Sequence, residues 1–112
     1  MLSRKSLAIA SLCTIVCAQA GAAEEAFKSS KFLTYSAEQQ KGYIGTAAVA
    51  ATVIASLNSQ TQSKCLGEWV TQHSAGGYQT VLDAMKKYPD DHPMGLIMSV
   101  LQRDCGPFKY SQ

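Results

Sequence analysis

Clustered metal ligands, nucleophile and base pairs, and glycine-rich phosphate loops are all missing from this chain of 112 residues. Its two histidines, His73 and His92, stand far apart in the sequence, and no cysteine or histidine accompanies either one at metal-ligand spacing. Each histidine is therefore expected to be a surface or capping residue. The sequence predicts no enzyme, no metal site and no cofactor, which leaves binding as the default role.

The chain also has no net charge once the N-terminal segment is left out of the count. Arg4 and Lys5 lie in a segment that we expect to be removed, so eight basic and eight acidic residues remain. The longest basic run is Lys86-Lys87. A chain without a positive field has no electrostatic footprint for nucleic acid or for an anionic membrane surface, so we expect neither as a partner.

The N-terminal segment has the organisation of a secretory signal peptide. Arg4 and Lys5 precede an uncharged run, Leu7 to Ala18, and small residues follow as far as Ala23. The run is shorter than the roughly 20 residues that a membrane-spanning helix needs, so no membrane anchor is expected. We assign residues 1–22 to a cleaved signal, with cleavage near Gly21 or Ala23, and predict a periplasmic location.

Only two cysteines, Cys65 and Cys105, remain after cleavage, in a compartment that oxidises thiols. They are predicted to form one disulfide. Closing a loop of about 40 residues stabilises a small domain by roughly 3–4 kcal/mol in the chain-entropy description. The alternative is a catalytic cysteine with His73 or His92 as its base, and the oxidising compartment argues against it.

The first clear helix begins at Ser36. Ser36 and Gln39 fit a capping box, in which each side chain satisfies the other residue's backbone amide. Asn58 is a plausible terminator, so the helix should be about twenty residues long. Apolar residues at three-four spacing predict its buried face: Tyr43, Ala47, Ala50, Ile54 and Leu57, widened by Ile44, Ala48 and Ala51.

This helix lies in a stretch, Gly42 to Ser63, without a single charged residue. Its apolar part is too short and too poor in large side chains for a membrane span. Small residues let neighbouring helices approach closely, and two interpretations follow: burial within the domain, or the seam of a homodimer. The small residues concerned are Gly42, Gly45, Ala47, Ala51 and Ala55.

The rest of the chain is predicted to form shorter helices. We expect a loop at 58–63, a short helical turn at 65–70 that buries Trp69, and a break at 71–77. A third helix follows from Tyr78 and ends at Pro89, and a last one ends at Cys105. An aspartate of Asp90-Asp91 is expected to cap the last helix. Residues 23–112 are thus predicted to be a single all-α domain of four helices with one disulfide.

The connection between Cys65 and Tyr78 is the predicted partner-binding surface. A loop held at one end by a disulfide, and containing glycines, suits insertion into the cleft of another protein. The candidate residues for contact with a protein partner are Glu68, Gln72, His73, Gly76 and Gly77.

The order of motifs resembles the Rap1a/Tai group of small periplasmic immunity proteins. The motifs are Phe32-Leu33, Gly42-Tyr43-Ile44-Gly45 opening an alanine-rich helix, Cys65, the run Lys87 to Pro93, and Cys105-Gly106. Together they cover nearly all of the mature chain. The resemblance implies an exported all-α domain with a disulfide, often dimeric. It also implies that the domain blocks a toxin injected by a type VI secretion system, typically a peptidoglycan amidase.

Two other functions remain as alternatives. One is a periplasmic acid-stress chaperone similar to HdeA/HdeB, which are also small, helical and held by one disulfide; this chain has eight carboxylates and two histidines that could respond to acid. The other is an accessory subunit of an envelope apparatus for secretion or conjugation. A toxin gene beside the gene for this chain would favour immunity, and an acid-response cluster would favour the chaperone.

Overall fold

The computed structural model describes residues 26–109, and this part of the chain is helical without a strand. Four helices of nine or more residues and one short helix make up the fold, so the predicted all-α class is confirmed and the count of four omits the short one. The helices are α2 (Ser29–Phe32), α3 (Ala37–Ser56), α4 (Gln60–Ser74), α5 (Gln79–Lys87) and α6 (Pro93–Cys105). The predicted signal peptide and its cleavage site lie outside the described residues.

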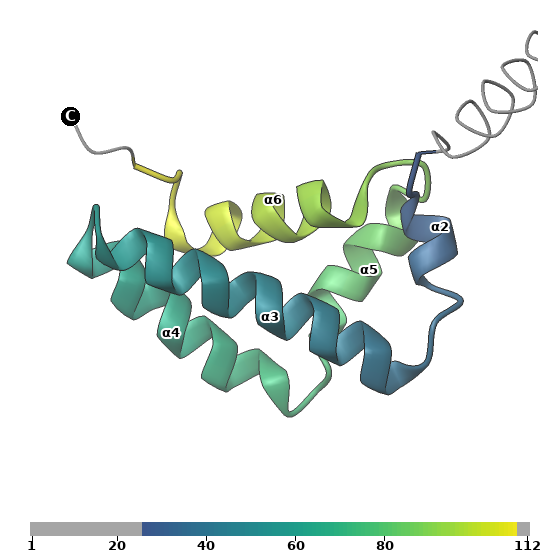
Figure 1. Ribbon diagram of the computed structural model, residues 1–112, viewed down its shortest axis with the longest axis horizontal. Helices are drawn as coiled ribbons and strands as arrows, with labels where there is room; N and C mark the ends of the chain where they lie inside the picture. Colours follow the sequence, from purple (N-terminus) through teal and green to yellow (C-terminus); the bar gives the residue numbers. More distant parts are fainter. Residues whose placement is uncertain (1–25, 110–112) are drawn as a thin grey trace, which may run out of the picture.

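Helix α3 is the long central element, with α4 packed along one side of it and α6 along another (Figure 1). Its start was predicted correctly: the Ser36 side chain accepts from the Gln39 amide and the Gln39 side chain accepts from the Ser36 amide, both at 3.2 Å. The helix has 20 residues, and Leu57 is its C-cap.

The buried face of α3 agrees with part of the predicted one, since Ile44, Ala47, Ala48 and Ala51 are buried as expected. The alanines at 47, 48, 51 and 55 and Ile44 are buried within the chain itself, whereas Ala50, Ile54 and Leu57 are exposed. The prediction is therefore wrong for Ala50, Ile54 and Leu57, which lie beside the core face and not on it. Small side chains allow α3 and its neighbours to approach closely, and four of the five buried residues of this helix are alanines.

Helix α4 corrects the prediction for residues 58–77. One helix of 15 residues, Gln60–Ser74, takes the place of most of the expected loop at 58–63, of the short turn at 65–70 and of the first part of the break at 71–77; residues 58–59 and 75–77 are non-helical as expected. It begins early because the Ser59 side chain accepts from the Gln62 amide at 3.3 Å. It continues because Gln62, Leu66 and Trp69, at four- and three-residue spacing, bury one face of it.

The ends of the last two helices follow the prediction except for one cap. Helix α5 ends before Pro89 and α6 begins at Pro93. The expected aspartate cap is wrong, because the His92 side chain is adjacent to the first turn and its Nδ1 accepts from the Met94 amide at 3.1 Å. The carbonyl of Asp91 instead accepts from both the amide and the hydroxyl of Ser29, at 2.9 and 2.8 Å, and so holds α2 against the turn.

The core is formed by side chains from all five helices, among them Phe32, Ile44, Leu66, Met85 and Ile97. Within residues 26–109, every buried side-chain nitrogen or oxygen has a hydrogen-bond partner. None of the helices in this range combines the length and the apolar character that crossing a bilayer requires.

Candidate functional site

The predicted disulfide is present and defines one edge of a polar cleft. Cys65 in α4 and Cys105 at the end of α6 are joined, with their Cα atoms 5.7 Å apart. Beside the bond lies a cleft of about 460 Å³ between the two helices. Its other lining residues are Glu68, Trp69, Gln72, His73, Arg103 and Asp104.

Hydrogen bonds fix the floor of this cleft. The indole Nε1 of Trp69 donates to Oδ2 of Asp104 at 2.9 Å. Arg103 donates from Nε to Oδ1 of Asp104 at 3.0 Å, and from Nη2 to Oγ1 of Thr80 at 3.1 Å. The carboxylate is thus held from two sides, and its two partners belong to different helices.

Trp69 also belongs to an aromatic cluster beside the cleft. The ring of Trp69 lies 4.6 Å from that of His73, centroid to centroid, and 5.6 Å from that of Tyr78, with which it is stacked. Trp69 and Tyr78 are buried, while His73 is half-buried and reaches the cleft. The polar rim therefore rests on a rigid apolar base.

The charges of the cleft stabilise one another. The hydrogen bond from Arg103 is the main cause that lowers the pKa of Asp104 below its ordinary value. Desolvation opposes this shift, while the Trp69 hydrogen bond and the charge of His73 add to it. The same hydrogen bond to Asp104 raises the pKa of Arg103. The cleft thus presents an ionised Arg103–Asp104 pair at neutral pH.

The predicted partner-binding residues fall into two groups. Glu68, Gln72 and His73 come together in the cleft, but they project from α4 and not from the loop that was expected. Gly76 and Gly77 lie in the short connection between α4 and α5 and do not line the cleft. The hypothesis of a loop inserted into a target is therefore wrong in its structural basis.

Arg103 and Asp104, which form the ion pair of the cleft, were not predicted from the sequence. The predicted disulfide could have indicated them. Arg103 and Asp104 immediately precede Cys105, and the bond from Cys105 to Cys65 brings them close to Glu68 and Gln72, which follow Cys65 by one and two helical turns. The side chain of Trp69 was predicted to pack into the core, which is confirmed, but its hydrogen bond across the cleft was not foreseen.

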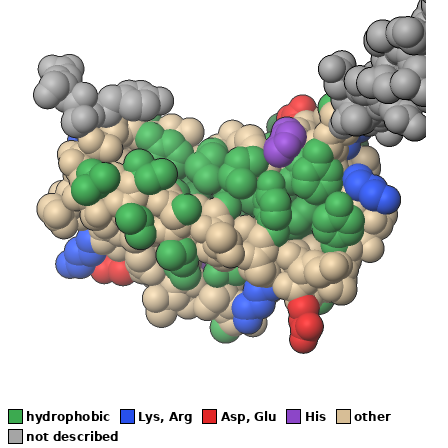
Figure 2. All heavy atoms as spheres, in the orientation of Figure 1, with side chains coloured by type: hydrophobic (Ala, Val, Ile, Leu, Met, Phe, Trp, Pro, Cys, Tyr) green, Lys and Arg blue, Asp and Glu red, His purple; other side chains and the backbone are tan. Residues whose placement is uncertain are grey.

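A second surface lies between α3 and α6. It is a largely apolar groove of about 300 Å³. Figure 2 shows hydrophobic side chains gathered in a band over these helices, with charged side chains towards the margins of the view. The groove is lined by Ala47, Ala50, Ala51, Ile54, Ala55, Asn58, Gln62, Met94, Met98, Phe108 and Lys109.

Within the described range, no three side chains among histidine, cysteine, aspartate and glutamate are grouped as metal ligands would be. No family model, curated protein or solved structure matches this chain. The described residues thus present two candidate binding surfaces, of which one is polar and the other apolar.

Proposed function

We propose that this chain is an exported immunity-type protein that acts by binding and not by catalysis. Its partner in this proposal is a toxin of the cell-wall amidase class, delivered into the periplasm by a type VI secretion system. The order of motifs from Phe32 to Gly106 supplies the toxin class, through its resemblance to the Rap1a/Tai group.

The observation that carries the proposal is the cleft beside the Cys65–Cys105 disulfide. Asp104 is held by Trp69 and Arg103 at hydrogen-bond distance, and the disulfide fixes α4 against the end of α6. Because Asp104 and the two helices beside it are already held in place, their ordering adds little to the cost of binding.

The residues exposed at the rim suit a protein surface with charges of both signs. Glu68 in α4 and Arg103 in α6 are both exposed, and Gln72, one turn after Glu68, offers both a donor and an acceptor. An arginine at the rim of an interface can bind a partner's carboxylate in a bidentate manner. The cleft is therefore proposed as the centre of the toxin-binding surface.

The test uses a secreted cell-wall amidase encoded beside the gene for this chain. We expect the wild-type chain to bind that amidase and to protect cells that receive it. Gln72→Ala and Glu68→Ala should each weaken binding, measured by calorimetry, by about tenfold or more if their contacts are central. Because neither side chain is part of the core, the melting temperature should change little.

Lys86→Ala on the exposed side of α5 is the matched control and should bind like the wild type. Hydrolysis of peptidoglycan by the chain itself would contradict the binding role. If the neighbouring amidase bound the wild type and both cleft variants equally well, the assignment of this cleft would be wrong.

A further inference from the structure

The apolar groove between α3 and α6 is long and follows the axis of α3. The residues that α3 contributes to it recur every three or four positions from Ala47 to Asn58, so they lie in one row along the helix. A rise of about 1.5 Å per residue makes this row roughly 16 Å long. The groove therefore suits a linear group better than a compact one.

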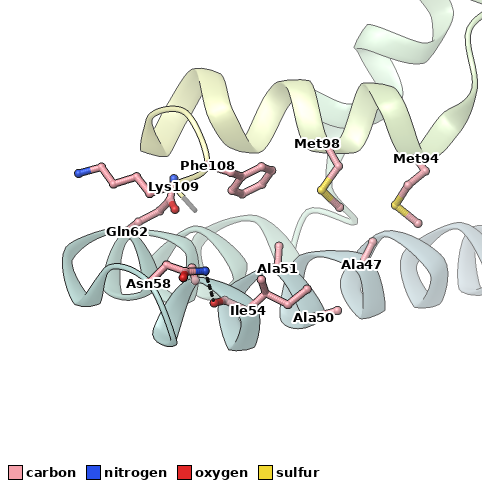
Figure 3. Close-up of a pocket in the computed structure, with 11 residues that line it drawn as sticks. Ala47, Ala50, Ala51, Ile54, Asn58, Gln62, Met94, Met98, Phe108 and Lys109 are labelled. Atoms are coloured by element: carbon pink, nitrogen blue, oxygen red, sulfur yellow. Dashed lines mark hydrogen bonds between the residues drawn. The ribbon is translucent and has the colours of Figure 1, made fainter. Parts of the chain in front are cut away.

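Small side chains on α3 and long ones on α6 form the two sides of the groove. Ala47, Ala51 and Ala55 contribute only methyl groups from α3. Met94 and Met98 are half-buried and project from α6 toward α3 (Figure 3). Because methionine side chains are unbranched and flexible, they can adapt to the outline of an apolar ligand. Both sides of the groove are therefore apolar, and one of them is adjustable.

A third wall of the groove comes from the residues that follow α6. The ring of Phe108 lies between α6 and α3 in Figure 3, and its backbone amide donates to Oε1 of Gln102 at 3.0 Å. The carbonyls of Gly106 and Pro107 each accept from the side chain of Gln62 at 2.9 Å. Hydrogen bonds to both α4 and α6 thus hold this segment, so the wall is present before any ligand binds.

The two ends of the groove differ in polarity. In Figure 3, Ala47 and Met94 lie at one end. Asn58, Gln62 and Lys109 lie at the other end. Lys109 is exposed, and among the described residues that line the groove it alone carries a charge. An anionic group at this end would therefore meet a cation and no acidic side chain of the described lining.

We propose that the groove binds a free fatty acid of medium chain length, with the carboxylate at Lys109 and the hydrocarbon chain running along α3 toward Met94. Its volume is about 300 Å³. A methylene group needs about as much room as a water molecule, roughly 30 Å³, so the groove has space for about ten. Volume and length thus agree on a chain of about twelve carbons. Apolar walls with a few polar groups that fix orientation are typical of ligand sites.

The openness of the groove predicts modest affinity. Complete burial of one methylene group strengthens binding about fourfold. A chain lying in an open groove keeps part of its surface in water, so we expect about twofold per methylene and a dissociation constant on the order of 10–100 μM. The groove shares no lining residue with the polar cleft beside the disulfide. This inference therefore does not depend on the proposed toxin partner.

The experiment is a titration of the disulfide-bonded protein with dodecanoate below its micelle concentration, at about pH 7.5, where a carboxylic acid is ionised. Amide NMR signals of Ala51, Ile54 and Met98 should shift and saturate. Octanoate, which is four methylenes shorter, should bind about tenfold or more weakly. Ala50→Phe fills the groove from an exposed position and should weaken dodecanoate binding about tenfold or more. Val49→Phe, at the neighbouring exposed position outside the lining, is the matched control and should bind like the wild type.

The position of the carboxylate has its own test. Dodecyltrimethylammonium has the same chain and the opposite charge, so the wild type should bind it about fivefold more weakly than dodecanoate. Lys109→Glu should reverse this preference, while Lys86→Glu, on the exposed side of α5, should leave it unchanged.

Signals that drift without saturation, or an Ala50→Phe variant that binds dodecanoate as tightly as Val49→Phe does, overturn the proposed site. A preference for dodecanoate that survives Lys109→Glu overturns the assignment of the carboxylate to Lys109. Melting temperatures of the ligand-free variants close to that of the wild type confirm that each one is folded, as expected for exposed positions.

Discussion

Trp69 donates its indole N–H to the carboxylate of Asp104 at 2.9 Å, although the two residues are 35 positions apart in the chain. The indole ring is otherwise buried, with 3 % of its surface exposed, so the hydrogen bond satisfies the one polar atom of a core side chain. The same contact connects the middle of α4 to the last turn of α6. This hydrogen bond therefore joins a core side chain, Trp69, to the charged residue Asp104 of the candidate binding cleft.

Trp69→Phe should lower the free energy of unfolding by about 1–3 kcal/mol, since it removes the hydrogen bond to a charged acceptor and part of a large buried ring. The measurement is urea denaturation followed by circular dichroism, which does not depend on indole fluorescence. Repeating the substitution in an Asp104→Ala background separates the two causes. If the loss is unchanged in that background, the hydrogen bond contributes nothing to stability.

The stability of the fold should depend on the ionisation of Asp104. The folded state lowers the pKa of this carboxyl, chiefly through the hydrogen bond from Arg103. The folded chain therefore releases this proton more readily than the unfolded chain. Its stabilising contribution is fully present above the ordinary aspartate value of about 4, and it is lost as the pH falls through the lower folded value.

Asp104→Asn keeps an oxygen that can accept from Trp69 but removes the charge. The melting temperature of this variant should fall below that of the wild type at pH 7, and the difference should shrink as the pH drops below about 4. Arg103→Gln removes the main cause of the lowered pKa of Asp104. Its melting temperature should therefore also fall below that of the wild type at pH 7, and this difference should also shrink below about pH 4. A difference between Asp104→Asn and the wild type that stays constant down to pH 2 would contradict this assignment.

The disulfide should be a major source of stability for so small a core. Cys65 and Cys105 close a loop of 40 residues, for which the chain-entropy description gives about 3–4 kcal/mol. Cys65→Ser and Cys105→Ser should each lose most of that amount, and the double variant little more, because either change opens the same loop. Losses that add in the double variant would show that the cysteines act separately.

The sequence was sufficient to predict the features that depend on local chemistry. The capping box at Ser36 and Gln39 and the end of α5 before Pro89 were both found where their residues indicate. The disulfide followed from counting cysteines and not from any local pattern. Each of these features involves only two or three residues, and the chemistry of those residues allows only one pairing or one helix boundary.

Features that depend on tertiary packing were harder to predict. Residues 58–63 are polar, which predicts a loop, but the buried side chain of Gln62 donates to the carbonyls of Gly106 and Pro107, both at 2.9 Å. A polar residue thus serves as a core-facing residue because its partners come from 44 and 45 positions away. No window of the sequence contains both ends of that interaction.

The partly wrong prediction for α3, in which Ala50, Ile54 and Leu57 turn out to be exposed, has a similar explanation. Both faces of the helix are apolar, so the spacing of apolar residues could not decide which face is buried in the chain itself. The core selected the alanines because they allow close packing against α4 and α6. The cleft was only half predicted for the same reason, since Arg103 and Asp104 join Glu68, Gln72 and His73 only through the packing of α6 on α4.

The two glycines between α4 and α5 should respond in opposite ways to substitution by alanine. Gly77 has φ +70°, in the left-handed region that a side chain disfavours, so Gly77→Ala should cost about 1–2 kcal/mol. A Cβ at Gly76 would meet nothing nearer than the His73 carbonyl oxygen at 4.0 Å. Gly76→Ala should therefore be neutral or slightly stabilising, because it restricts the unfolded chain.

The same pair separates the two proposed locations of the partner surface, because both glycines were candidates for contact but only the residues of α4 line the cleft. Gly76→Ala should leave toxin binding unchanged if the cleft is the contact surface, while Gln72→Ala weakens it. Thermal denaturation and calorimetry on the same preparations measure both properties. If Gly76→Ala abolished binding without any change in melting temperature, the α4–α5 connection would be the contact surface and the cleft would not.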